Sequence, residues 1–472
     1  MKGILVTMMT AISSLSFAQN IDSKLATAIN SLEADAQFKH AIISLYVVDS
    51  KTGKVVFDKN SQIGLAPASC QKVITSTSAF EMLGKDYRYK TSFVNGKYFD
   101  GKGGNDLYII GSGDPTFGSK RYTGTIDTTI FNSVYINFQR KKMNSFHKVY
   151  VNDITFGNNA IPRGWIWEDI ANYYGAGAHQ LNWKENQYDI IFSSGIPGMP
   201  SRITSIEPKM PGITFNSAIV AGKVGSGDNG YAFFMPAQDT ILLQGTIPPN
   251  KKMFSISGAT PNPPQVFLTE FENYFSNNNH LLSIDKTEVG KMFDGYYNGF
   301  RGERPDVEMD TIYNYYSPPL DSINYWFLKR SINLYGEAFV KTIAYEKTKF
   351  GTTDTGVAII KNFWKDKGIE PSAINIIDGS GLSPANRVTT NALVTVMQYA
   401  KKQNWFSSFY YDLPEINGIK MKDGYITGVR SYTGYIKSAK GSEYTFSFIV
   451  NNFDGSAGTV REKMWKLLDI LK

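Results

Sequence analysis

Cysteine is almost absent from this chain of 472 residues, in which only Cys70 occurs. A single cysteine excludes an intramolecular disulfide, so packing alone must hold the fold together. Histidine is also rare, and none of the four histidines stands at helical ligand spacing from another. That pattern argues against a zinc hydrolase, and the sequence predicts neither a metal nor another cofactor. We expect Cys70 to be a small buried side chain rather than a nucleophile.

Apolar runs long enough to span a membrane are missing as well. The apolar stretch of residues 3–15 follows the positive Lys2 and precedes a small-x-small sequence that ends at Ala18. It is shorter than the roughly 20 residues that a spanning helix needs. Residues 1–18 therefore indicate a cleaved export signal, which predicts a mature chain from Gln19 and a location in the periplasm or cell envelope. An uncleaved membrane anchor is the alternative.

Charge of one sign does not cluster anywhere in the chain. The net charge of +7 and the pI of about 9.0 are spread along the sequence. This balance suits an acidic polymer or an anionic surface and does not indicate nucleic acid as a partner. A basic, amphipathic helix expected at residues 460–471 predicts at most peripheral membrane contact, and docking onto a sheet is its more ordinary role.

The length corresponds to roughly three folding units. Alternating β-branched residues at 41–58 predict a hairpin, and residues 66–83 predict a helix. Many short β-like runs and tight turns then predict an inserted β-rich region over residues 86–311. Helical periodicity returns over residues 320–349, and a last hairpin is expected at residues 424–452.

The helix predicted at residues 66–83 carries Ser69 and Lys72 in its first turn. Residues three apart share one face of a helix, so a neutral Lys72 amine can take the proton of the Ser69 hydroxyl. The positive end of the helix dipole would favour the developing alkoxide. Two other Ser-x-x-Lys spacings lack a Pro-Ala entry into an apolar helix and are expected at the surface: Ser145 to Lys148 and Ser283 to Lys286.

A second motif, Ser331-x-Asn333, lies inside the helical stretch of residues 320–349. Residues two apart on a helix point in different directions, so this pair can act together only at a helix start or in a short connection. The same spacing occurs at Ser322-x-Asn324. We favour Ser331 because of the residues that follow it, which is a judgement from family resemblance.

A third motif, Lys422-Asp423-Gly424, is expected to open a strand. A cation and backbone N–H groups on such a strand can bind a substrate carboxylate and an oxyanion. An earlier Lys-Thr-Gly at residues 51–53 lies between two strand-like runs, and we expect it to be a turn.

In this order, Ser-x-x-Lys, Ser-x-Asn and Lys-x-Gly resemble the signature set of penicillin-binding proteins and serine β-lactamases. Further segments resemble the penicillin-binding protein 4 type, the D-alanyl-D-alanine carboxypeptidase/endopeptidase family: residues 67–69, 111–115, 165–177, 317–320, 333–338 and 378–383. The similarity spans almost all of the mature chain. It implies an α/β (α+β) fold, in which a β-lactamase-like peptidase domain of residues 19–85 and 312–472 carries a β-rich insertion of residues 86–311.

The resemblance also implies a role for each motif residue. Ser69 would attack the carbonyl of the penultimate D-alanine, with Lys72 as the acylation base. Ser331 and Asn333 would relay the proton and orient the substrate, and Lys422 would polarise the relay and help to hold the terminal carboxylate. Water would then release the acyl group. The partners implied are peptidoglycan stem peptides, with β-lactam antibiotics as acylating inhibitors.

Substrate binding would involve the third motif and the insertion. The backbone N–H groups of Ser69 and Tyr425 would form the oxyanion hole. Gly424 and Thr427, which lie close to Tyr425 in the sequence, are further candidate substrate-binding residues. In the insertion, Asp153 is a candidate contact to the diamino acid of the stem peptide, and a capping or turn role is its alternative.

The chain departs from this family at Asp423, where relatives usually carry a hydroxyl residue. A hydroxyl donates a hydrogen bond to a carboxylate, whereas an ionised aspartate cannot. Two like charges about 4 Å apart repel by about 4 kcal/mol at the effective dielectric of a partly buried site. Asp423 then either points away from the cleft and pairs with Arg430 or Lys420, or shifts preference towards cross-link cleavage, or marks a weakened enzyme retained for binding.

Two rival functions remain compatible with the motifs. A β-lactamase or esterase would share the fold, although the large insertion argues against a compact β-lactamase. A non-catalytic peptidoglycan-binding protein is suggested only by Asp423, because the other motif residues are all retained.

Overall fold

The computed structural model describes residues 21–96, 105–152, 155–157, 159–236, 238–277, 282–290 and 309–472. These residues form two compact units, each assembled from separate segments of the chain. The first unit comprises the described part of Met1–Met82 together with Asn324–Ser331 and Val357–Lys472. The second comprises Leu83–Ile323 and Ile332–Gly356. The chain therefore passes repeatedly between the two units.

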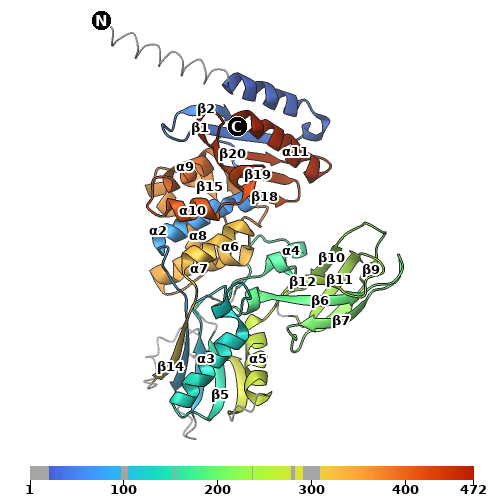
Figure 1. The fold of residues 1–472 in the computed structure, drawn as a ribbon, viewed down its shortest axis with the longest axis vertical. Coiled ribbons are helices and arrows are strands. Elements are labelled where there is room, and N and C mark those ends of the chain that lie inside the picture. The colour runs from blue at the N-terminus through green and yellow to red at the C-terminus, as the bar shows by residue number, and fades with distance from the viewer. Residues whose placement is uncertain are drawn as a thin grey trace. The chain divides into compact units, whose positions relative to one another are not determined.

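The first unit contains both strands and helices (Figure 1). A helix at residues 21–33 precedes its first strand. Its other elements are η1 (Ala36–Phe38), β1 (Ile42–Asp49), β2 (Val55–Lys59), η2 (Ala68–Gln71), α2 (Lys72–Met82), η6 (Pro371–Ala373), β15 (Ile374–Asn375), β16 (Arg387–Val388), α9 (Thr390–Ala400), α10 (Phe406–Asp412), β17 (Glu415–Ile416), β18 (Ile419–Ile426), β19 (Val429–Lys437), β20 (Glu443–Asn451), α11 (Ala457–Leu468) and η7 (Asp469–Leu471). Two helices, α6 (Leu320–Lys329) and α8 (Thr353–Asp366), run from the second unit into the first.

Six strands of this unit form an antiparallel sheet in the order β17-β18-β19-β20-β1-β2, and β15 and β16 pair separately. Successive side chains of a strand point to opposite faces, and both faces of β1 are buried. Leu45 and Val47 join a large core on one face, whereas Tyr46 and Val48 pack with Val394 of α9 on the other. The sheet is therefore covered on both sides.

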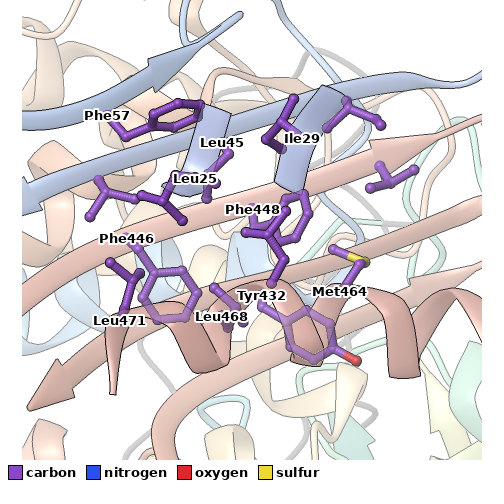
Figure 2. Packing of buried hydrophobic residues seen from close by; sticks show 14 of the residues in the cluster. Leu25, Ile29, Leu45, Phe57, Tyr432, Phe446, Phe448, Met464, Leu468 and Leu471 are labelled. Carbon is purple, nitrogen blue, oxygen red and sulfur yellow. The ribbon is translucent and has the colours of Figure 1, made fainter. Parts of the chain in front are cut away.

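The large core lies between the sheet, the helix at residues 21–33 and α11 (Figure 2). Leu25 and Ile29 reach it from the first helix, and Met464 and Leu468 reach it from the last. Both ends of the described chain thus complete one core, which confirms the expectation that the terminal helix docks on a sheet. No helix among the described residues is long and apolar enough to cross a membrane.

The second unit contains the segment that the sequence predicted to be β-rich. One of its sheets has the order β13-β5-β4-β3-β14, and two smaller sheets have the orders β12-β6-β7 and β10-β11-β8, with β9 beside β11. The elements are β3 (Lys90–Gly96), β4 (Asp106–Ile110), η3 (Thr123–Thr125), α3 (Asp127–Arg140), β5 (Ser145–Asn152), α4 (Trp167–Ile170), η4 (Tyr173–Gly175), η5 (Lys184–Asn186), β6 (Gln187–Ser193), β7 (Arg202–Glu207), β8 (Thr214–Ser217), β9 (Val220–Ala221), β10 (Asn229–Phe233), β11 (Thr240–Ile247), β12 (Phe254–Ala259), α5 (Pro263–Asn277), β13 (Ser283–Gly290), β14 (Met309–Tyr316) and α7 (Asn333–Thr348).

The mixed helix-and-strand architecture confirms the expected fold class, and most predicted elements are present. The hairpin at residues 41–58 is β1 and β2, with residues 51–53 at its turn, as expected. Helix α3 was not expected in the β-rich region; its apolar face packs into the core of the larger sheet through Ile130, Phe131 and Val134. The third motif lies in the middle of β18 rather than at its start.

The helical stretch predicted over residues 320–349 is broken where the second motif lies. Helix α6 ends at Lys329, Ser331 has a φ of 56°, and α7 begins at Asn333. A non-glycine residue in the left-handed region cannot continue a right-handed helix. Ser331-x-Asn333 therefore occupies a short connection, as its spacing requires, whereas the Asn324 of the rival triplet is buried inside α6.

The core on the sheet face should control the stability of the first unit. Leu45 is fully buried there, so replacing it with alanine should lower the free energy of unfolding by about 2–5 kcal/mol, because the cavity cannot fully collapse. Val55 on the neighbouring strand is 57% exposed, and Val55→Ala should change the free energy of unfolding by no more than about 0.5 kcal/mol. Urea unfolding would compare the two; equal losses would contradict this account of the core.

Candidate active site

Ser69 lies on a short 3₁₀ turn that leads directly into α2. Pro67 precedes the turn, and the Cys70 N–H donates to the Pro67 carbonyl at 3.2 Å. Ala68, one residue before Ser69, has a φ of 45°. The left-handed region is costly for a residue with a Cβ, and such strain persists only where the surroundings enforce it. The conformation of the Ser69 segment is therefore imposed from outside.

The Ser69 hydroxyl lies within hydrogen-bond reach of a buried lysine. The Lys72 Nζ is 2.9 Å from the Ser69 Oγ, donates to the Ser380 carbonyl at 2.7 Å, and lies 5.8 Å from the centre of the Phe327 ring. Lys72 is fully buried. A candidate general base must lie about 2.6–3.2 Å from the proton it removes, and this pair meets that condition.

A loop at residues 378–383 supplies the second partner of Lys72. The Asp378 carboxylate accepts backbone N–H groups from Gly381 and Ser383, each at 2.8 Å, and the Asn386 amide at 2.9 Å. The Gln71 side chain, beside Lys72, also donates to Asp378, at 2.9 Å. One buried carboxylate therefore folds the loop and ties it to the nucleophile segment. In the sequence, this loop stands out only by its resemblance to the family, which implies no role for it.

Two glycines let other backbones approach the nucleophile segment closely. A Cβ on Gly381, which has a φ of +81°, would lie 2.0 Å from the Ala68 carbonyl oxygen. A Cβ on Gly424 of β18 would lie 2.9 Å from the Ser69 nitrogen and 2.8 Å from the Pro67 carbonyl oxygen. These distances are too short for any side chain, so only glycine fits at either position. The loop and β18 hold the Ser69 segment between them.

Further contacts fix β18 and β19 against the same segment. The Ser431 Oγ donates to the Pro67 carbonyl at 2.6 Å, and the Cys70 Sγ donates to the Lys422 carbonyl at 3.2 Å. Cys70 is fully buried, and burial raises the pKa of its thiol to about 11. A thiol of that pKa is protonated at neutral pH, and Cys70 binds β18 through its hydrogen bond to Lys422.

Lys422 projects from β18 and is paired with its neighbour. Its Nζ donates to the Asp423 carbonyl at 2.8 Å and to the Asp423 Oδ1 at 2.9 Å. The ion pair of Asp423 is thus with Lys422 rather than with Lys420, and the charge of Arg430 also acts on the carboxylate. Lys420 donates to the Leu413 carbonyl instead, and the Arg430 guanidinium lies 5.4 Å from the centre of the Tyr425 ring.

The structure describes all but one of the remaining residues that were predicted for the site. Ser331 follows α6 and ends the chain segment Asn324–Ser331 of the first unit, and Phe327 of α6 faces Lys72. Asn333 belongs to the second unit, where its amide donates to the Tyr174 carbonyl at 2.8 Å. Tyr425 is 53% exposed near the end of β18, and Thr427 lies in the exposed turn that follows. Asp153 lies outside the described residues, as does the predicted export signal.

The two rival Ser-x-x-Lys spacings lie on strands. Ser145 to Lys148 is part of β5, and Ser283 to Lys286 is part of β13, which pairs with β5 in parallel. Residues three apart on a strand point to opposite faces, so neither spacing can form a serine–lysine pair. Among the described residues, no three side chains of His, Cys, Asp or Glu are grouped closely enough to hold a metal ion.

Comparison with known proteins places this geometry in a family. The model of the D-Ala-D-Ala carboxypeptidase 3 (S13) family matches residues 25–470. The chain belongs to that family. Membership gives it the activity class of a serine-type D-Ala-D-Ala carboxypeptidase/endopeptidase that acts on peptidoglycan, as the sequence motifs predicted.

Curated and solved relatives cover nearly the same length. The D-alanyl-D-alanine carboxypeptidase of Actinomadura sp. is 23% identical over 92% of this chain and 82% of its own, and the penicillin-sensitive carboxypeptidase A of Dictyostelium discoideum is 26% identical over 84% and 80%. The crystal structure of penicillin binding protein 4 (dacB) from Haemophilus influenzae matches with a TM-score of 0.74 at 16% identity, over 96% of this chain and 97% of that one. The fold is therefore that of penicillin binding protein 4.

The glycine on β18 provides a test of the site geometry. Gly424→Ala should displace the Ser69 backbone, and a misplacement of about 1 Å can cost about 10²-fold in rate. We expect acylation by benzylpenicillin to slow by about that factor, as measured by intact mass over time. Gly195 has no atom within 4 Å of an added Cβ, so Gly195→Ala should leave the rate unchanged. Equal rates in both variants would argue against the close approach.

Proposed function

We propose that Ser69 is the acylating nucleophile of this peptidase and Lys72 its base. The observation that carries the proposal is the separation of 2.9 Å between the Lys72 Nζ and the Ser69 Oγ at a fully buried lysine. The Lys72 amine takes the hydroxyl proton while the Ser69 Oγ bonds to the carbonyl carbon of the penultimate D-alanine. The same proton then passes to the leaving amine, which departs as D-alanine or as the amine of a cross-link.

The other motif residues stabilise the negative charge on the substrate oxyanion and transfer the proton in this step. The N–H groups of Ser69 and Tyr425 stabilise the oxyanion, and a donor of this kind typically contributes about 10²–10³ in rate. Ser331 and Asn333 relay the proton and orient the substrate, and Lys422 polarises that relay. Water finally attacks the ester and regenerates the Ser69 hydroxyl. The close approach of Gly424 to the Ser69 backbone, together with the exposure of Tyr425 and of Thr427 in the following turn, supports a substrate site along β18.

The domain organisation that we propose follows the same division of labour. Residues 19–85 and 312–472 form the peptidase domain, and residues 86–311 form an insertion that helps to recognise the stem peptide. The discontinuous make-up of both compact units supports an insertion of this kind. Asp153 is our candidate contact to the diamino acid, on its position in the sequence.

The partners and location that we propose follow from the family and from the N-terminal sequence. The substrates are stem peptides or cross-links of peptidoglycan, and β-lactams acylate Ser69. A solved structure of the Haemophilus influenzae penicillin binding protein 4 is a complex with a β-lactam. Residues 1–18 direct export to the periplasm or cell envelope, and contact with the membrane is at most peripheral. Nucleic acid is not a partner.

Acylation of Ser69 can be tested directly by mass. Incubating residues 19–472 with benzylpenicillin should add one whole antibiotic molecule, because opening of the lactam ring loses no atoms. Ser69→Ala should abolish the adduct, and Cys70→Ala should retain it, since the buried thiol is not the nucleophile. An adduct that survives in folded Ser69→Ala would contradict the assignment. Rapid loss of the adduct from the unaltered protein would instead favour a β-lactamase.

The role of Lys72 is tested by the rate of the same reaction. Lys72→Met keeps most of the side-chain volume but removes the base, so adduct formation should slow by about 10²–10⁴-fold. Lys148, in the rival Ser-x-x-Lys spacing on β5, gives a matched control, and Lys148→Met should leave the rate unchanged. Undiminished acylation in folded Lys72→Met would show that another group takes the proton.

A further inference from the structure

In the third motif, the Asp423 carboxylate is the exposed charged group, whereas the family motif leads us to expect the Lys422 ammonium there. Lys422 is 1% exposed, whereas the side chain of its partner Asp423 is 38% exposed. Two hydrogen bonds to Asp423, one to its carbonyl and one to its carboxylate, engage the Lys422 ammonium. A ligand that reaches this point of β18 therefore meets the Asp423 carboxylate, with the lysine beneath it.

Asp423 is charged under ordinary conditions. Its burial acts to raise the pKa of the carboxyl group, but the positive charge and hydrogen bond of Lys422, together with the charge of Arg430, outweigh burial and lower that pKa below its usual value. An ionised carboxylate accepts hydrogen bonds and cannot donate them. The substrate group that satisfies it must therefore bring a donor, such as an amide N–H or an ammonium.

The position of Asp423 along β18 connects this charge to the leaving group. Gly424, the next residue, lies against the Ser69 backbone, and Lys422 holds the Cys70 thiol through its carbonyl. A substrate acylating Ser69 along this strand therefore places its next residue near Asp423. In a peptide ending in D-Ala-D-Ala, that residue carries a free carboxylate, which is also only an acceptor. Two acceptors of like charge would then face each other.

We propose that Asp423 selects substrates whose leaving group has no free carboxylate beside the scissile bond. The preferred leaving groups are an amidated residue or an amine-bearing cross-link residue, either of which can donate a hydrogen bond to Asp423. The proposal rests on the assignment of Ser69 as nucleophile and specifies the substrate class of that same site. It assigns Asp423 a specificity role and leaves the chemical step to Ser69 and Lys72.

The experiment compares two peptides that differ in one group. Both end in N-acylated D-Ala-D-Ala, one with a free carboxylate and the other with a C-terminal amide, and release of D-alanine or D-alaninamide gives kcat/KM for each. The unaltered enzyme should prefer the amide by about 10-fold or more. Asp423→Asn keeps the shape and removes the charge, so it should raise kcat/KM for the acid by about 10-fold and leave the amide nearly unchanged.

Two controls separate an effect of the Asp423 charge from the effect of a charge change elsewhere and from a loss of acylation. Asp86 has an 81% exposed side chain and lies in the other unit, so Asp86→Asn makes the same charge change and should not alter the preference. Adduct formation with benzylpenicillin is measured in every variant. If adducts form but the ratio of acid to amide is the same in Asp423→Asn, or neither peptide is cleaved, the role of Asp423 is overturned. If no folded variant forms an adduct, the assignment of Ser69 fails and the inference fails with it.

Discussion

Direct contact between backbones is the constraint on which this active site depends. The segment that carries Ser69 is held between the loop at residues 378–383 and strand β18, and each approaches it through a glycine that has no room for a side chain. This contact accounts for the left-handed conformation of Ala68, which the local sequence does not favour. It also fixes the Ser69 hydroxyl relative to a strand along which a peptide can lie. The nucleophile is thus positioned by segments more than 300 residues away in the chain.

A single buried carboxylate organises one side of this arrangement. Asp378 closes its own loop through backbone N–H groups and reaches across to Gln71, which stands next to Lys72. Another carbonyl of the loop, that of Ser380, accepts from the Lys72 Nζ. Loss of Asp378 would therefore act on the base through the loop. Its importance is positional, because its contacts are with the supports of the catalytic pair.

The ion pair between Lys422 and Asp423 distinguishes the other side. The lysine retains the place that the family motif assigns it, while its neighbour turns the exposed surface of the motif negative. The proposed catalytic residues Ser69 and Lys72 lie on η2 and at the start of α2, whereas the Lys422–Asp423 pair lies on β18, which approaches the Ser69 backbone through Gly424. The proposed selection of the leaving group could therefore change without any change at Ser69 or Lys72.

The sequence by itself determined the family, the activity class and the candidate residues of the site. The order and spacing of the three motifs singled out Ser69 and Lys72 as candidates, and the rival serine–lysine spacings, which lie on strands, were set aside because they lack a Pro-Ala entry into an apolar helix. Spacing also required a break in the helix at Ser331, and the structure has one. These features are local, so periodicity and side-chain chemistry are sufficient to predict them.

Only the tertiary structure decided what surrounds that chemistry. The role of Asp378 and the packing of α3 depend on contacts between distant segments, whereas the backbone of β18 decides which neighbouring cation pairs with Asp423. Gln71 and Asp378 lie 307 residues apart in the sequence, and only the folded chain brings the amide to the carboxylate. Long-range packing decides such pairings because side-chain reach is set by three-dimensional distance, which spacing along the chain does not specify.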